Sequence, residues 1–328
     1  HTSSRDSTWK PVYGERSSIR DHYNQVDVKL ASSRGSGHAL TISFRLYDEG
    51  LAFCYTVSSD DGSTKIRIVR EHTEFRFTAD HTAWAVYSAQ GKYRRVSISQ
   101  LKKGCERPLT IAAGVATYMA VGEARLVDYA RMKLSPLPGQ SYALVSHLDG
   151  PVEAESPIVT PWRTVAVANS PGGLLERNYL TLNLNDPCAL SDTSWIRPGK
   201  VLREVTLTTS GARACVDFAA ANGLQFVEFD AGWYGHEYSD QSDATTVTVD
   251  PKRSPGPLDL PAVIQYAHDR GIDIILYVNR RALERQLDEI LPLFRQWGVS
   301  GVKYGFVQVG PQRWTSWLHE AVRKAAEY

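Results

Sequence analysis

The sequence predicts a multi-domain protein of β and α/β type, in which a large antiparallel β-sandwich is followed by four βα units. In the first half, short runs alternate apolar and polar residues and are separated by turn residues. In the second half, strand-like apolar runs alternate with helix-like runs. The 328 residues also suit two domains, at roughly 150 residues per domain. We therefore place a sandwich domain at 1–190 and an α/β domain at 191–328.

Composition excludes several classes of function. The net charge is +1 and no segment is strongly basic, so neither a nucleic acid nor an anionic membrane is an expected partner. No apolar run approaches about 18 residues, which predicts that the chain has no membrane-spanning helix. The four cysteines have no metal-binding spacing, and three of them lie in apolar contexts that predict small buried residues.

The strands of the first half can be followed in order along the chain. Alternating runs predict strands in four segments, namely 39–57 (two strands around a turn that ends at Gly50), 65–77, 94–101 and 142–148. The segment 150–157 is polar and bounded by proline, so we expect a loop there.

The second half has the pattern of a parallel sheet covered by helices. Strand-like runs lie at 201–208, 224–230, 272–278 and 301–307, and helix-like runs lie at 212–223, 258–271, 282–298 and 314–328. Three of these helix-like runs end in glycine, as helices with a left-handed C-terminal residue do, at Gly223, Gly271 and Gly298. The four units could form half of a (β/α)₈ TIM barrel or a small open sheet.

The barrel interpretation gives a role to the run VEFDAGWYG at 227–235. Barrel enzymes place their chemistry just after the carboxyl ends of the strands. Asp230 lies at one such end, and Asn279 and Lys303 lie at or beyond two others. We therefore expect Asp230 to face a pocket, with Trp233 at the start of the pocket wall.

Six stretches of the chain resemble landmarks of glycoside hydrolase family 97 and occur in the family's order. They are WKPVYGERSSIRDHYNQVDVKL (9–30), FRLYDEGLAFCY (44–55), EARLVDYARM (123–132), TPWRTV (160–165), LTLNLNDPC (180–188) and GVKYGFVQVG (301–310). Together they extend over nearly the whole chain, so the chain is identified as a member of this family.

The resemblance implies a β-super-sandwich packed on a catalytic (β/α)₈ barrel, oligosaccharide substrates with α-linked sugars, and often a catalytic Ca²⁺ ion. It also implies a periplasmic or secreted protein. The chain would begin partway into the sandwich and end after the first half of the barrel. The family's general acid and several of its calcium-binding glutamates would then follow Tyr328, so no metal ligand can be named in this chain.

Asp230 and Lys303 are the strongest candidates for a site. Asp230 could bind sugar hydroxyls or assist proton transfer, or it could anchor a turn, since Asp-x-Gly is also a turn signal. A lysine is costly in an apolar layer, so Lys303 either faces the barrel mouth or forms a structural ion pair. The resemblance implies that this lysine contacts the sugar in the −1 subsite.

Gly305 bears on the mechanism. By resemblance, retaining members read Lys-x-Asp here and use the aspartate as nucleophile, whereas inverting members have glycine and leave room for the attacking water. The inverting members' His-His-Glu after the third strand is replaced by a segment with Asn279 and Arg280. The base would then be Asp230 or a carboxylate outside this chain. Asn279 and Arg280 could bind substrate, and Arg280 could instead pair with Glu284.

Other polar and aromatic residues have a structural interpretation. Glu71, Glu74 and Glu123 of the sandwich are predicted to be surface carboxylates. The loop 235–257, which carries His236 and Glu237, is either a mobile lid or a solvated excursion. Five tryptophans are expected in the core or between domains, at positions Trp84, Trp162, Trp195, Trp314 and Trp317.

The sequence therefore predicts an α-glycosidase that releases terminal α-linked glucose or galactose, with inversion of the anomeric centre. Asp230 is the predicted catalytic residue, and Lys303, Trp233, Asn279 and Gly305 are the predicted substrate-binding residues. The alternative is a family-97-like protein that binds glycans without hydrolysing them, because two expected catalytic positions lack a carboxylate.

Overall fold

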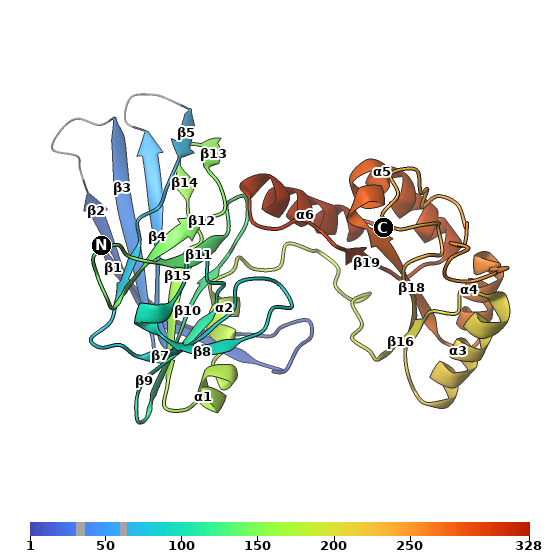
Figure 1. The fold of residues 1–328 in the computed structure, drawn as a ribbon, viewed down its shortest axis with the longest axis horizontal. Coiled ribbons are helices and arrows are strands. Elements are labelled where there is room, and N and C mark those ends of the chain that lie inside the picture. Colours follow the sequence, from blue (N-terminus) through green and yellow to red (C-terminus); the bar gives the residue numbers. More distant parts are fainter. Residues whose placement is uncertain (31–36, 60–63) are drawn as a thin grey trace. The chain divides into compact units, whose positions relative to one another are not determined.

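The computed structural model describes residues 1–30, 37–59 and 64–328 (Figure 1). Within these residues the chain divides into two compact units. The first unit comprises His1–Thr193 and Val309–Ser316, and the second comprises Ser194–Gln308 and Trp317–Tyr328.

The first unit is built on one large sheet. In the described residues this sheet has ten strands, and every pairing in it is antiparallel. Its order is β1 (Thr2–Trp9), β2 (Ile19–Leu30), β3 (His38–Tyr47), β4 (Gly50–Ser59), β15 (Trp162–Ala168), β10 (Thr117–Ala124), β9 (Leu109–Gly114), β7 (Thr82–Ala85) and β8 (Arg94–Ser97), with β14 (Ile158–Val159) beside β4.

Two small antiparallel sheets accompany the large one. The strands β11 (Met132–Pro136), β12 (Ala143–Leu148) and β6 (Glu74–Arg76) form one, and β13 (Val152–Glu155) and β5 (Lys65–Ile68) form the other. Ile111 and Val121 of the large sheet share a core with Met132 and Leu144 of the three-stranded sheet. The predicted antiparallel sandwich is therefore confirmed.

The other face of the large sheet is covered by two short helices that the β-type prediction for 1–190 did not include. They are α1 (Pro171–Glu176) and α2 (Tyr179–Asn183). Leu180 packs with Cys54 and Trp162 of the sheet. A single 3₁₀ turn, η1 (Ile98–Gln100), follows β8.

The second unit is an α/β structure with a four-stranded parallel sheet, and all of its residues are described. The strands lie in chain order: β16 (Val201–Glu204), β17 (Phe226–Phe229), β18 (Asp273–Asn279) and β19 (Gly301–Gly305). The helices after the strands are α3 (Thr209–Ala221), α4 (Leu260–His268), α5 (Arg280–Trp297) and α6 (Gln312–Ala325), of which α6 begins in the first unit.

The helix ends follow the chemistry of their residues. Gly223, Gly271 and Gly298 have φ of 65°, 70° and 83°, so the predicted left-handed glycines are confirmed. At the other ends, Thr208 and Asp259 accept hydrogen bonds from backbone N–H groups of α3 and α4. None of the described helices is both long enough and apolar enough to cross a membrane.

Candidate active site

Strand alternation gives the parallel sheet two different faces. On the helix-covered face, Val227, Phe229, Leu276 and Val278 are fully buried in the core. Alternate residues of the same strands point to the opposite face, because successive side chains of a strand point in opposite directions. We call these residues the polar face: Arg203, Glu228, Asp230, Tyr277, Lys303 and Gly305.

Lys303 joins two carboxylates of the polar face. Its Nζ lies 3.1 Å from Oε1 of Glu228 and 3.6 Å from Oδ1 of Asp230. Arg203 pairs with the other oxygen of Asp230 at 2.8 Å. The side chain of Lys303 is 46% exposed, so the ammonium group is not sealed in a core. The structure thus brings together Asp230 and Lys303, the two strongest sequence candidates.

Glu228 is a site residue that the sequence reasoning missed. It precedes Asp230 by two positions on β17, and its carboxyl group is 7% exposed. The signal was present in the run LQFVEFD, because residues two apart on a strand share a face. A second acid beside Asp230 could have been predicted from that spacing alone.

Two opposing effects act on the pKa of Glu228. Burial raises the pKa of its carboxyl group above the usual value, and the hydrogen bond from Lys303 opposes this rise. A buried carboxyl group beside a second carboxyl group is an arrangement used for proton transfer. Together with the ammonium of Lys303, these groups provide hydrogen-bond donors and acceptors for a polyhydroxylated ligand.

Asn279 was predicted to bind substrate, but the structure buries its side chain at the start of α5. It is fully buried, and its side-chain oxygen accepts a hydrogen bond from the N–H of Arg281 at 3.1 Å, which caps α5. Its backbone N–H donates to the hydroxyl of Tyr234 at 2.8 Å. The correction follows from the position: a strand-to-helix junction needs an N-cap, and asparagine is a preferred one. Arg280 pairs with Glu284 at 3.1 Å.

Gly305 does not leave an open space for water, contrary to the prediction. A Cβ built on Gly305 would overlap the ring and the hydroxyl oxygen of Tyr277 on the neighbouring strand. Tyr277 and Gly305 lie on the adjacent strands β18 and β19. In the register of these strands, Tyr277 is opposite Lys303. The ring of Tyr277 therefore fills the space that a side chain at position 305 would take.

Trp233 belongs to the core and not to a pocket wall. Its side chain is fully buried, and its ring lies 4.9 Å from Tyr234 and 5.9 Å from Phe294, between ring centroids. Its indole N–H donates to the backbone carbonyl of Tyr277 at 2.8 Å. A positive φ of 108° at Gly232 turns the chain just before this residue. The prediction that Trp233 binds substrate is therefore wrong, because its side chain is fully buried.

Part of the loop after β17 is packed against the unit, so the loop is not wholly a solvated excursion. Glu237, Ala244 and Asp250 in the loop are buried. Oε1 of Glu237 pairs with Arg253 at 2.6 Å, and Oε2 accepts a hydrogen bond from Tyr277 at 2.5 Å. No local pattern in the sequence predicts the burial of Glu237, because its partners Arg253 and Tyr277 lie 16 and 40 residues further along the chain.

Two of the three sandwich acids are buried, whereas all three were predicted on the surface. Glu71 and Glu123 pair with Arg163, which is fully buried, at 2.5 and 2.8 Å. Burial disfavours the charge of Arg163, but hydrogen bonding and attraction to Glu71 outweigh it and hold the pKa of Arg163 above its usual value. Glu74 is exposed, as predicted.

The described residues offer no fit to a calcium site. Across residues 1–30, 37–59 and 64–328, no group of three or more His, Cys, Asp or Glu side chains is arranged to hold a metal ion. Calcium prefers six to eight oxygen ligands, and the pair Glu228–Asp230 is already occupied by Lys303.

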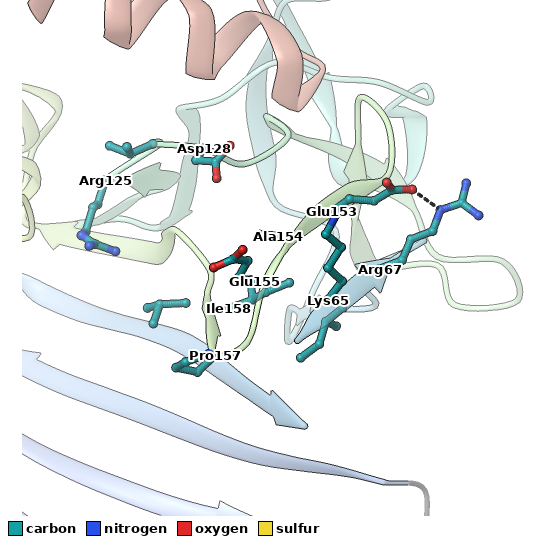
Figure 2. A pocket seen from close by; sticks show the side chains of 12 residues that line it. Lys65, Arg67, Arg125, Asp128, Glu153, Ala154, Glu155, Pro157 and Ile158 are labelled. Carbon is teal, nitrogen blue, oxygen red and sulfur yellow. Dashed lines mark ion pairs between the residues drawn. The ribbon is translucent and has the colours of Figure 1, made fainter. Parts of the chain in front are cut away.

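A hollow of about 980 Å³ lies in the first unit (Figure 2). None of its lining residues belongs to the strands of the α/β sheet. It is lined by β5, β13 and the segment 125–128. Figure 2 shows Arg67 and Glu153 joined by an ion pair at 3.0 Å, with Arg125 at the other end of the view. The charged groups that line it are of both signs.

Comparison with known proteins agrees with the resemblance seen in the sequence. Residues 1–187 match the model described as "Glycosyl-hydrolase 97 N-terminal", and residues 195–328 match the model described as "Glycoside hydrolase 97". The chain is 26% identical to a retaining α-galactosidase of Bacteroides thetaiotaomicron, covering 97% of this chain and 53% of that protein. It is 27% identical to a probable retaining α-galactosidase of Streptomyces bingchenggensis, covering 92% and 48%.

Solved structures show the same fold. A family 97 enzyme of Pseudoalteromonas sp. strain K8, in complex with acarbose, superposes with a TM-score of 0.89 at 24% identity, over 100% of this chain and 56% of that one. A β-arabinopyranosidase superposes with a TM-score of 0.83 at 18% identity, with the same shares of the two chains. The chain spans about half the length of the curated relatives it matches. Because the two family models together match residues 1–187 and 195–328, this chain belongs to glycoside hydrolase family 97.

Proposed function

We propose that the protein containing this chain is an α-glycosidase that releases terminal α-linked glucose or galactose from oligosaccharides. The observation that carries the proposal is the cluster of Glu228, Asp230 and Lys303 on the polar face of the α/β sheet. Membership of a glycosidase family supports it, as do two curated relatives named as α-galactosidases.

The cluster suggests a role for each side chain. Asp230 and Lys303 would hold sugar hydroxyls, since an ionised carboxylate accepts hydrogen bonds and an ammonium group donates them. Glu228 would hold a proton more readily than an ordinary glutamate, because burial raises its pKa. We propose that it orients Lys303 and buffers the charge of the site as the sugar binds.

We further propose that hydrolysis inverts the anomeric centre. Gly305 has no side chain that could attack an anomeric carbon, and the volume beside it is filled by Tyr277. A single displacement by water needs no covalent glycosyl-enzyme. The two curated relatives are named as retaining enzymes. The stereochemistry of the product therefore decides whether this protein inverts or retains the anomeric centre.

The experiment uses the complete protein that contains this chain, incubated with aryl α-galactoside and aryl α-glucoside. Proton NMR of the first-formed sugar would show the β-anomer for inversion and the α-anomer for retention. Release of neither sugar would contradict the proposed activity. An α-anomer would leave the activity standing and overturn inversion.

A glycan-binding protein without hydrolytic activity is the second candidate. It is favoured by Gly305 and Asn279, which provide no carboxylate at two positions where one was expected. In that case calorimetry would detect binding of an α-linked trisaccharide, and no sugar would be released. A Lys303→Met variant would then lose binding.

Three further properties are proposed for the whole protein. The order β16-β17-β18-β19, with helices between strands, suits the first half of a (β/α)₈ barrel. A catalytic Ca²⁺ ion is also proposed, although the described residues contain no group of three or more His, Cys, Asp or Glu side chains that could hold it. Loss of activity in EDTA that CaCl₂ restores would support the ion. A periplasmic or secreted location can be tested by cell fractionation.

A further inference from the structure

Tyr277 and Glu237 form a hydrogen-bonded pair that the proposed binding of substrate does not use. The hydroxyl of Tyr277 donates to Oε2 of Glu237 at 2.5 Å. Both residues are buried, with 4% and 5% of their surfaces exposed. A hydrogen bond this short between a phenol and a carboxylate places the proton on a direct path between the two oxygens.

The carboxylate of Glu237 is held in a fixed orientation. Its Oε1 pairs with Arg253 at 2.6 Å, which leaves Oε2 directed at Tyr277. The amide nitrogen of Asn279 lies 3.4 Å from Oε2 and 3.3 Å from the oxygen of Tyr277. Glu237 is therefore supported on both sides, and its acceptor oxygen faces one main proton donor.

The phenol oxygen occupies the place where a side chain at position 305 of β19 would begin. A Cβ on Gly305 would overlap Tyr277 at its hydroxyl oxygen. The ring also lies beside the cluster, since Nζ of Lys303 is 5.5 Å from its centroid. Of the side chains around Glu237, Tyr277 is thus the one that connects it to the polar face.

We propose that Tyr277 and Glu237 act together as the general base, with the phenol relaying a proton from the attacking water to the carboxylate. This inference rests on the proposed glycosidase activity and on the proposed inversion, so an α-anomer as the first product would overturn it as well. The water oxygen bonds to the anomeric carbon as the glycosidic C–O bond breaks, and the leaving oxygen takes a proton from the general acid. The water gives a proton to the oxygen of Tyr277, whose own proton passes to Oε2 of Glu237.

The surroundings suit a relay better than a phenolate nucleophile. Burial raises the pKa of Tyr277 well above its usual value, and the hydrogen bond to Glu237 raises it further, so the phenol stays protonated. A neutral phenol both donates and accepts, as a relay must. The charged groups facing the pair are Arg253 on the loop and Lys303 on β19.

Two variants of the complete protein test the relay, Tyr277→Phe and Glu237→Gln. Phenylalanine preserves the ring against Gly305 but cannot carry a proton. Glutamine preserves an acceptor for Arg253 but cannot take up a proton at neutral pH. We expect each variant to lose about 10²–10⁴-fold in kcat on an aryl α-glycoside, the usual contribution of a general base. KM should change little.

The matched control is Tyr304→Phe. Tyr304 lies on β19, faces the helices, and donates its hydroxyl to the carbonyl of Ala321 at 2.9 Å. This variant loses a partly buried tyrosine hydroxyl without touching the polar face, so its kcat should remain within a few-fold of the unmodified protein. Thermal melting of all three variants shows whether they remain folded.

Sodium azide distinguishes the relay from a structural role, because azide attacks without giving up a proton. If the relay is correct, azide restores turnover in Tyr277→Phe and Glu237→Gln and yields a β-glycosyl azide. Folded variants with nearly full kcat would overturn the relay, and so would a loss that azide does not restore. If the unmodified protein has no activity, the proposed function fails first, before the variants are compared.

Discussion

The ring of Tyr277 occupies the space that a side chain at Gly305 would need. The two residues lie on neighbouring parallel strands, and the hydroxyl of Tyr277 is fixed by Glu237. A glycine that looks like an empty position in the sequence is therefore a requirement for close packing.

A Gly305→Ala substitution should destabilise the second unit. The new methyl group must displace the ring of Tyr277 and lengthen its hydrogen bond to Glu237, at a cost of about 1–3 kcal/mol. Faster hydrogen exchange in peptides covering β18 and β19 would report the change. Gly301→Ala is the matched control on the same strand, because its Cβ would meet only Ile275, at an ordinary 3.5 Å. Equal effects of the two substitutions would contradict the packing argument.

Removal of Arg163 should be one of the most damaging changes in the first unit. Arg163→Met leaves Glu71 and Glu123 buried without their shared cation, which costs about 3–5 kcal/mol. Urea unfolding should show the loss. Arg67→Met removes an exposed pair with Glu153 and should cost less than about 1 kcal/mol. Adding Glu71→Gln and Glu123→Gln to Arg163→Met should recover part of the stability.

Asn279→Ala should weaken the start of α5. The substitution removes the N-cap and two amide contacts in a fully buried position, for an expected loss of about 2–3 kcal/mol. Thr208→Ala removes the cap of α3 in a partly exposed position, and should cost about 0.5–1 kcal/mol. Thermal melting of both variants gives the comparison. An Asn279→Ala protein as stable as the unmodified one would argue against the cap.

Lys303→Met should make stability depend more strongly on pH. Burial already raises the pKa of Glu228 in the folded state, and loss of Lys303 raises it further. A folded-state pKa above the unfolded value means that protonated Glu228 stabilises the folded state. This contribution to the free energy of unfolding is fully present below the unfolded pKa of about 4.3 and is lost as the pH rises through the higher folded pKa. The loss in Lys303→Met should be about 1–2 kcal/mol greater at pH 7 than at pH 4.

The control for that prediction is Lys324→Met. Lys324 also pairs with a carboxylate, Asp288, at 2.8 Å, but that carboxylate is 79% exposed. Water can solvate Asp288 when its partner is removed, so the stability of this variant should change little between the two pH values. A Lys303→Met deficit that is the same at pH 4 and pH 7 would show that Glu228 does not need the ammonium group.

Part of the site was predictable from local pattern. Asp230 and Lys303 were found because buried parallel strands rarely hold charged residues without a reason. Glu228 could have been found by the same pattern, since it is two residues from Asp230. Glu237 could not, because it is buried by Tyr277 and Arg253, which lie 40 and 16 residues further along the chain.

The sequence by itself determined the antiparallel class of the first unit, the alternation of strands and helices in the second, and the C-terminal ends of three helices, because these depend on periodicity and on backbone preferences within a few residues. Only the tertiary structure decided that Trp233 fills the core, that Asn279 caps a helix, and that Glu71 and Glu123 surround Arg163. A polar or aromatic side chain is stable inside only where distant segments provide its partners. Those partners become neighbours when the strands pair and the helices pack.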